Sequence, residues 1–373
     1  MKKLFVFFLL ITCFISCTTK EIKVTVENPS DFDRLSEMVE IPVEDIKAKI
    51  TLTKNDVFVV TDSKGEIVPS QLTFDGKLIF QANLKAKETG TFNIKPGKSQ
   101  TFQAQTFGRL IPERKDDFAW ENDRVAFRIY GQALVPIDGP SNGLDVWYKR
   151  TSNLIIDKWY EKDLAGIASY HNDNGEGQDD YKVGRTLGAG AMAPYTDNKL
   201  WLNENYVLQE VFENGPLRTT FKLTYKDVDV AGKTYSETRT FSIDAGSQLT
   251  KVIQEYGFTA QTPVAAGLVK RGNDSIIVSP KNDFIIYVEP FSQVVDQVYL
   301  ALVFPEKFES STIDVYNDAA SHVLAITTYQ PNAPVTYYTG YGWSKFGFVS
   351  LEDFQQYIQH FSEALQQPFI INY

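Results

Sequence analysis

The side chains best able to transfer protons are concentrated in one segment near the middle of the chain. Residues 170–192 read YHNDNGEGQDDYKVGRTLGAGAM. Acids, bases and a histidine crowd into this segment: His171, Asp173, Glu176, Asp179, Asp180, Tyr181, Lys182 and Arg185. Imidazole, carboxylate and phenol groups are the usual general acids and bases of enzymes. The segment is therefore a candidate active site, and the alternative interpretation is a solvated acidic loop.

The same segment has the composition of a loop. No apolar period runs through its first half, which argues against a buried strand or an amphipathic helix. Glycines free its backbone, among them Gly175, Gly177, Gly184 and Gly188. Such a loop can aim polar groups at a ligand.

Two further segments place cations beside aromatic rings. One reads Asp-Val-Trp-Tyr-Lys-Arg at 145–150, and the other reads Trp-Ser-Lys at 343–345. Aromatic faces cover the apolar face of a pyranose, and basic side chains pair with a carboxylate or sulfate. We therefore expect Trp147 and Trp343 to stack on a sugar, with Lys149, Arg150 and Lys345 binding its acid group. The alternative is a core aromatic with a basic side chain lying along it.

These groups suit elimination on a uronic acid. A cation neutralises the carboxylate, a base removes the C5 proton, and an acid assists departure of the C4 substituent. Arg185, with Lys149 or Arg150, is the expected carboxylate ligand. His171 and Tyr181 are the expected base and acid. Lys182 would favour the phenolate through its positive charge.

Other functions remain open alongside elimination. Hydrolysis would use two carboxylates drawn from Glu176, Asp179 and Asp180, of which the first and last are also expected to bind substrate. Mutarotation or epimerisation would use His171 and His322 with one carboxylate. A protein that binds a glycan without turning it over is the fourth possibility. The enzyme class we favour is a carbon–oxygen lyase.

Metal binding is a weaker expectation for the same loop. Four acidic residues follow the spacing Asp173-x-x-Glu176-x-x-Asp179-Asp180, and oxygen ligands on a flexible loop can bind Ca²⁺. The spacing is not that of an EF-hand. No other cofactor is expected.

The N-terminus is typical of an exported lipoprotein. Met-Lys-Lys precedes an apolar run from Leu4 to Ile15, and Ser16 and Cys17 follow it. That run is too short to span a bilayer and reads as a signal peptide, 1–17. The ending Phe-Ile-Ser-Cys resembles a lipobox, so we expect Cys17 to be acylated, with plain secretory cleavage as the alternative. A lipid anchor in the cell envelope, at the outer membrane, facing either the periplasm or the cell surface, would follow.

Charge limits the possible partners. The net charge is −10, from 37 Lys and Arg against 47 Asp and Glu. This argues against nucleic acid, or an anionic membrane surface, as the main partner. We expect an acidic oligosaccharide as the partner, with the lipid anchor as the only membrane attachment. The oligomeric state is left open.

The rest of the chain predicts an all-β protein. After a tether at 18–30, short apolar runs about ten residues apart, separated by turns such as Asp75-Gly76, indicate an immunoglobulin-like sandwich over 31–105. Alternating runs such as 125–129 and 217–225 then indicate a larger domain of packed sheets over 106–373.

One helix is expected at the end of the chain. Ser350 can cap it with Asp353 at the third helical position. Its apolar residues fall on one face: Phe354, Tyr357, Ile358, Phe361 and Leu365. Pro368 follows its end. His360 lies on this helix and is interpreted as structural.

Several blocks together resemble a known family. The blocks are residues 121–131, 145–150, 170–190 and 341–345, which read ENDRVAFRIYG, DVWYKR, YHNDNGEGQDDYKVGRTLGAG and YGWSK. They resemble the lipoprotein family called domain of unknown function 4861, found in polysaccharide-utilisation clusters of Bacteroidetes. The resemblance covers most of the chain after about residue 25. It implies a galactose-mutarotase-like supersandwich and a step in glycan breakdown, since a dehydratase of ulvan oligosaccharides is a relative. It transfers no catalytic residues.

Overall fold

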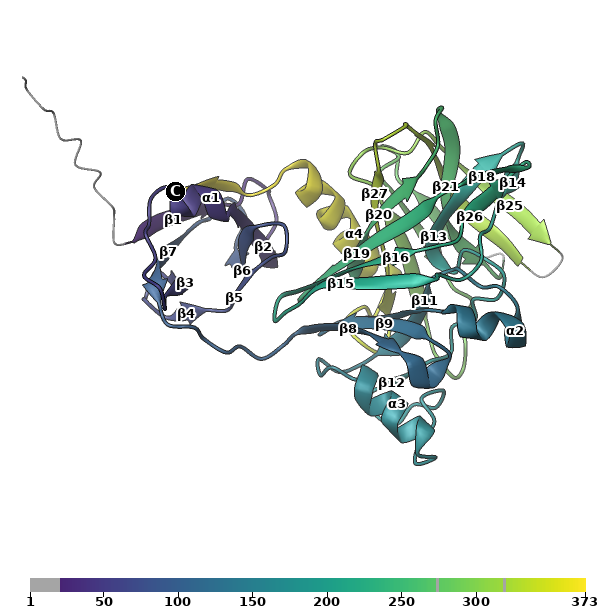
Figure 1. The fold of residues 1–373 in the computed structure, drawn as a ribbon, viewed down its shortest axis with the longest axis horizontal. Coiled ribbons are helices and arrows are strands. Elements are labelled where there is room, and N and C mark those ends of the chain that lie inside the picture. Colours follow the sequence, from purple (N-terminus) through teal and green to yellow (C-terminus); the bar gives the residue numbers. More distant parts are fainter. Residues whose placement is uncertain (1–20, 273–274, 318–319) are drawn as a thin grey trace, which may run out of the picture.

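The protein consists of a small and a large β-rich domain (Figure 1). The computed structural model describes residues 21–272, 275–317 and 320–373. The predicted signal peptide and the lipidation site at Cys17 lie outside the described residues. The expected all-β class with a helix near the C-terminus is confirmed.

The small domain is a sandwich of two antiparallel sheets. One has the order β28-β1-β7-β3-β4 and the other the order β2-β6-β5. The strands of the first sheet are β1 (Ile22–Glu27), β3 (Val57–Asp62), β4 (Ile67–Val68), β7 (Thr89–Gly97) and β28 (Ile370–Asn372). Those of the second are β2 (Arg34–Pro42), β5 (Ser70–Leu72) and β6 (Lys77–Leu84), with helix α1 (Val43–Lys47) after β2.

Both ends of the described chain contribute to this sandwich. β1 pairs with β7 on one side and with β28 on the other. Ile22, Val24 and Val26 are buried in the core of the sandwich. The tether expected at 18–30 is therefore corrected: residues 22–27 form a strand, because their alternate apolar side chains fit a half-buried sheet.

The large domain contains an eight-stranded and two five-stranded sheets. The eight-stranded sheet has the order β15-β16-β19-β20-β27-β24-β23-β22. Its strands are β15 (Leu208–Asn214), β16 (Arg218–Thr224), β19 (Glu237–Asp244), β20 (Leu249–Tyr256), β22 (Ile276–Val278), β23 (Phe284–Val288), β24 (Val298–Val303) and β27 (Val335–Trp343).

One five-stranded sheet has the order β14-β13-β21-β26-β25, and the other has the order β12-β11-β10-β9-β8. The strands of the former are β13 (Ala189–Thr196), β14 (Lys199–Leu200), β21 (Thr262–Lys270), β25 (Ser310–Asn317) and β26 (Ala320–Tyr329). Those of the latter are β8 (Thr106–Ile111), β9 (Asp117–Asn122), β10 (Ala126–Ile129), β11 (Asp145–Lys149) and β12 (Gly177–Gln178). A hairpin is formed by β17 (Val228–Val230) and β18 (Lys233–Tyr235).

One large core joins these sheets. Trp120 of β9 packs on Phe127 of β10 and on Phe221 and Phe241 of the eight-stranded sheet, with ring centroids 5.0 to 5.3 Å apart. The opposite face of β9–β11 is covered by helix α3 (Ile156–Leu164). Short helices occupy the connections: η1 (Pro112–Arg114), η2 (Gln132–Leu134) and α2 (Val135–Asp138).

Helix α4 (Leu351–Gln366) lies between the two domains (Figure 1). Ser350 and Asp353 form the predicted capping box, in which each side chain accepts the other's backbone N–H. Phe354 and Ile358 are buried against β23 and β24. His360 stacks on Phe32 of the small domain at 3.9 Å. None of the helices in the described ranges is long and apolar enough to cross a membrane.

Candidate active site

A cluster of charged side chains is buried on the face of β9–β11 that α3 covers. Arg128 of β10 pairs directly with Asp145 of β11 and with Ala119 of β9. Directly paired residues share a face of a sheet, and so do residues two apart along a strand. Arg128, Asp145 and Asp117 are therefore neighbours on one face.

Arg128 is the centre of this cluster. Its Nη2 donates to Asp145 Oδ2 at 2.5 Å and to Asp179 Oδ2 at 2.8 Å. Its Nη1 lies 4.0 Å from Asp117 Oδ2. The Tyr130 hydroxyl donates to Asp145 Oδ2 at 2.9 Å. A single guanidinium group thus lies beside three carboxyl groups.

Burial shifts the titration of these carboxyl groups. Removal from water raises the pKa of Asp145 to about 7, against the opposing effect of Arg128. It raises the pKa of Asp117 to about 6 and also raises that of Asp179. A single cation does not offset the cost of three buried carboxylates. Burial therefore makes these carboxyl groups harder to ionise than exposed ones, and they titrate as interacting groups.

His171 connects this buried cluster with solvent. Its side chain is 59% exposed, whereas Asp179 beneath it is 2% exposed. Nδ1 lies 3.0 Å from the Asp179 backbone oxygen and 3.5 Å from Asp179 Oδ2. Both oxygens are acceptors, so they favour the tautomer with the proton on Nδ1. Nε2 then carries the free lone pair and is available as a base.

The loop around His171 brings several predicted residues together. Arg150 donates to Asp173 Oδ1 through Nη2 at 3.0 Å. Glu176 Oε2 accepts from Lys158 of α3 at 2.6 Å. Asp180 is exposed next to Asp179. No group of three or more His, Cys, Asp or Glu in the described ranges is placed to hold a metal ion, and the Asp173 and Glu176 carboxylates already contact cations.

Two predicted binding residues lie in the interior instead. Trp147 is fully buried and packs on Trp159, Tyr160 and Tyr170 at 5.0 to 5.4 Å. Neither face of its indole is open to a sugar. Lys149 is also fully buried, where its ammonium contacts Glu121 Oε2 at 2.7 Å.

The contacts of Glu121 explain why Lys149 is buried. Glu121 Oε1 accepts from the backbone N–H groups of Ile155 and Ile156 at the start of α3. The Lys149 ammonium also donates to the Asn122 backbone oxygen at 2.6 Å. The expected sugar-binding roles of Trp147 and Lys149 are therefore corrected to positions inside the structure, where each side chain fixes α3 against β9–β11.

Tyr181 and Trp343 are buried in the main core of the large domain, whereas Trp147 belongs to the smaller cluster beneath α3. The Arg271 guanidinium lies 4.3 Å from the centre of the buried Tyr181 ring and donates to the Lys182 backbone oxygen. Burial raises the pKa of Tyr181 well above that of a free phenol. Trp343 is 1% exposed, so it is not available as a stacking platform.

Trp343 and the nearby Lys345 each donate a hydrogen bond to a backbone oxygen. Trp343 donates through Nε1 to the Val295 backbone oxygen at 2.7 Å. Lys345, which is exposed, lies 5.5 Å from the Trp343 ring and donates to the Val294 backbone oxygen. The cation–aromatic pair predicted at 343–345 exists, with the ring on the core side.

The last two predicted residues are Arg185 and His322, and their hydrogen bonds are to residues outside the surroundings of His171. Arg185 donates to the backbone oxygens of Asn203 and Leu202 at 2.6 and 2.8 Å. His322 is fully buried, and its Nε2 accepts from the Leu187 N–H at 3.1 Å. Burial lowers the pKa of His322 to about 4, so it is neutral at physiological pH.

Sequence reasoning missed the centre of the cluster. Arg128 lies in the alternating run 125–129, a pattern typical of a strand with one solvent-exposed face. Both faces of the strand are in fact covered, one by α3 and one by the main core. Asp117, Tyr130 and Asp145 were not singled out for chemistry. Three charged residues, one on each of three consecutive strands, were the available signal: Asp117, Arg128 and Asp145.

The fold is similar to that of two larger solved structures. The chain resembles the crystal structure of an α-mannosidase from Enterococcus faecalis V583, with a TM-score of 0.52 and 10% identity, over 95% of this chain and 46% of that one. A structure in glycosyl hydrolase family 38, also from Enterococcus faecalis, gives a TM-score of 0.50 and 11% identity, over 95% of this chain and 47% of that one. The chain thus spans about half the length of these proteins.

The family follows from sequence. The chain belongs to the family described as domain of unknown function DUF4861, which matches residues 26–371. It is 29% identical over 382 residues to uncharacterized protein P7 of Formosa agariphila, covering 96% of this chain and 95% of that protein.

Proposed function

We propose that this protein acts on acidic oligosaccharides, by β-elimination across C4 and C5 of a uronic acid residue. One observation carries the proposal. An exposed imidazole, His171, is oriented through Nδ1 by Asp179, and the Asp179 carboxylate is itself held by the buried Arg128 guanidinium.

Two resemblances support the substrate class. The fold is like that of an α-mannosidase, an enzyme that acts on carbohydrate. The sequence blocks resemble a family with a dehydratase of ulvan oligosaccharides among its relatives. The first resemblance favours a sugar, and the second favours elimination over hydrolysis.

His171 can perform both proton transfers. Its Nε2 removes the C5 proton, and that C–H electron pair forms the C4–C5 double bond as the C4–O bond breaks. The imidazolium then returns the proton to the departing oxygen, which leaves as water or as a sugar hydroxyl. Asp179 stabilises the imidazolium through Nδ1–H. Arg150, which directly follows β11 and contacts Asp173 of the His171 loop, is our candidate for binding the substrate carboxylate.

The location forms part of the same proposal. An N-terminal acyl group on Cys17 would hold the protein at the outer membrane, where imported or surface-bound oligosaccharides are available. Ca²⁺ at the loop is not required for this scheme, since His171 and Arg150 supply the base and the cation.

The test uses uronate-containing oligosaccharides and absorbance of the unsaturated product in the ultraviolet. We expect His171→Ala to lower the rate by about 10²- to 10⁴-fold. Asn172→Ala is the matched control, because Asn172 is an exposed neighbour on the same loop. Unchanged turnover in His171→Ala would exclude this mechanism.

Hydrolysis is the second candidate. The raised pKa values of Asp117 and Asp145 are the property that a general acid needs in a glycosidase. Both carboxyl groups are buried. A proton from either group could reach a sugar oxygen by way of the Tyr130 hydroxyl, or after a local opening of the structure exposes the carboxyl group. New reducing ends without ultraviolet absorbance would favour this reaction.

A further inference from the structure

A hollow with a volume of about 760 Å³ lies between the two domains. Its walls are the small sandwich, the outer face of the eight-stranded sheet, and α4. Pockets for small ligands are commonly about 300 to 1,000 Å³ and occur preferentially at domain interfaces. The volume and the position therefore suit a ligand of one or a few sugar units.

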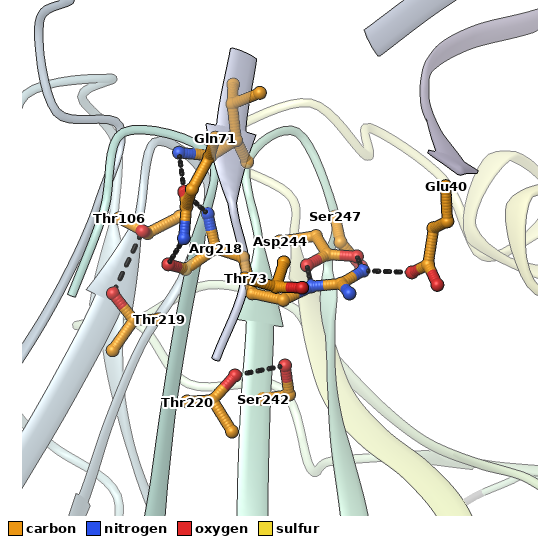
Figure 2. A network of polar contacts seen from close by, with 12 residues as sticks. Glu40, Gln71, Thr73, Thr106, Arg218, Thr219, Thr220, Ser242, Asp244 and Ser247 are labelled. Carbon is orange, nitrogen blue, oxygen red and sulfur yellow. Dashed lines mark hydrogen bonds and ion pairs between the residues drawn. The ribbon is translucent and has the colours of Figure 1, made fainter. Parts of the chain in front are cut away.

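One wall of this interdomain cavity is polar. Arg218 of β16 donates to Asp244 through Nε and Nη2 at 2.5 and 2.7 Å, and its Nη2 lies 2.7 Å from Glu40 Oε1 (Figure 2). Glu40 belongs to the small domain and also binds Lys77 at 2.7 Å. Arg218 thus connects the two domains and pairs with both Asp244 and Glu40, whereas Glu213 on the same wall accepts from the Thr220 hydroxyl.

Lys251 is the exception on the same wall. It lies on β20, directly opposite Ser242 of β19, and it lines the cavity. Within the described ranges, its ammonium has no hydrogen bond or ion pair. Burial lowers its pKa, and the nearby Arg218 lowers it further, more than Glu40 raises it. The cations Arg218 and Lys77 and the carboxylates Glu40 and Asp244 therefore act on Lys251 in opposite directions.

The facing wall is apolar and aromatic. Phe361 and Leu365 of α4 line it, next to the stacked rings of Phe32 and His360. An aromatic surface covers the C–H face of a pyranose, while hydroxyl groups require polar partners on the other side. Thr220 and Ser242, whose hydroxyls lie 3.0 Å apart on the polar wall, are such partners (Figure 2).

We propose that the interdomain cavity is a second sugar site, in which the Lys251 ammonium binds the carboxylate or sulfate of an acidic sugar and α4 supplies the apolar wall. The sugar class is the one proposed for the His171 site, but the two sites share no residue. The cavity would hold a further unit or a separate chain of the glycan while chemistry proceeds at His171.

The experiment is calorimetric titration of the full chain with three probes: methyl glucuronide, methyl glucoside 6-sulfate and methyl glucoside. We expect at least one acidic probe to bind more tightly than the neutral one, and the pair of acidic probes distinguishes carboxylate from sulfate. Lys251→Gln should weaken binding of the acidic probe by about tenfold or more, because a charge-assisted contact is lost.

Lys222→Gln is the matched control. Lys222 lies on β16 in the same sheet but lines a different hollow, so this variant should bind like the wild type. His171→Ala should also keep the Lys251-dependent binding, which separates this proposal from that for the His171 site. A thermal melt of each variant checks that the fold is intact.

Three results would overturn the proposal. They are equal affinity for the neutral and acidic probes, equal losses in Lys251→Gln and Lys222→Gln, and no binding of any probe at millimolar concentration. A loss of acidic-probe binding in His171→Ala with none in Lys251→Gln would assign the binding to the loop instead.

Discussion

The Arg128 guanidinium and the Asp145 carboxyl group face each other across directly paired strands, with Nη2 and Oδ2 2.5 Å apart. Their side chains are 4% and 0% exposed. An ion pair this deeply buried is maintained only when the surrounding groups stay satisfied. Here Asp179 and Tyr130 also bind the pair, and Asp179 connects it to His171.

The first prediction concerns the pH dependence of stability. The pKa of Asp145 is about 7 in the folded protein and 3.8 in an unfolded chain. The folded state therefore binds the proton more tightly between these values, so this group makes the protein less stable as pH rises from about 4 to 7. Asp145→Asn cannot titrate and should reduce that loss.

Denaturant unfolding at pH 5 and pH 8 measures this difference. Asp117, with a pKa of about 6, acts in the same direction and remains in the variant, so part of the slope persists. Asp180→Asn, at the exposed neighbour of Asp179, should behave like the wild type. An unchanged slope in Asp145→Asn would show that its carboxyl group does not hold the proton.

Trp147 distinguishes a structural role from a sugar-binding role. Its indole is buried among three aromatic rings beneath α3. We expect Trp147→Ala to lower the free energy of unfolding by about 3 to 5 kcal/mol, because a cavity replaces a large core side chain. A sugar platform would instead lose affinity at nearly unchanged stability. Chemical denaturation and glycan binding, measured together, separate these outcomes.

Much of the fold was predictable from local pattern. Ser350 and Asp353 predicted a helix start, and alternation at 125–129 predicted a strand, because caps and side-chain periods depend on neighbours in sequence. Burial of Arg128 was not predictable this way. It depends on α3 and on Asp179, which reach β10 only through tertiary packing.

The same reason limits the prediction of the site. His171 and Asp179 lie in one loop, so the segment containing a base and its acidic partner was identified from spacing. Lys149 and Trp147 were expected to face a ligand because a cation beside an aromatic ring is common both in sugar sites and in cores. Only the position of α3, which covers this face of the sheet, shows that these two residues belong to the core and not to a sugar site.

His322 gives a pH effect of opposite sign. Its pKa is about 4 in the folded protein, below the 6.5 of an exposed imidazole. The unfolded chain therefore binds the proton more tightly, and stability falls as pH drops from about 6.5 to 4. The loss attributable to this group is on the order of 3 kcal/mol.

His322→Gln removes this titration and keeps an acceptor for the Leu187 N–H. We expect its stability at pH 4 to lie closer to its value at pH 7 than in the wild type. His360→Gln is the control, since His360 lies on α4, away from β26. If both variants follow the wild-type profile, burial of His322 is not what destabilises the protein in acid.

Variants of Lys149 and Glu121 measure how much a buried ion pair contributes to the free energy of unfolding. Lys149→Met leaves the Glu121 carboxylate buried without its cation, and we expect a loss of about 3 to 5 kcal/mol in unfolding free energy. The double variant Lys149→Met with Glu121→Gln removes both charges, while the amide oxygen can still accept from Ile155 and Ile156. It should recover much of the loss. Double-mutant unfolding measures the coupling, and additive losses would show that Lys149 does not compensate Glu121.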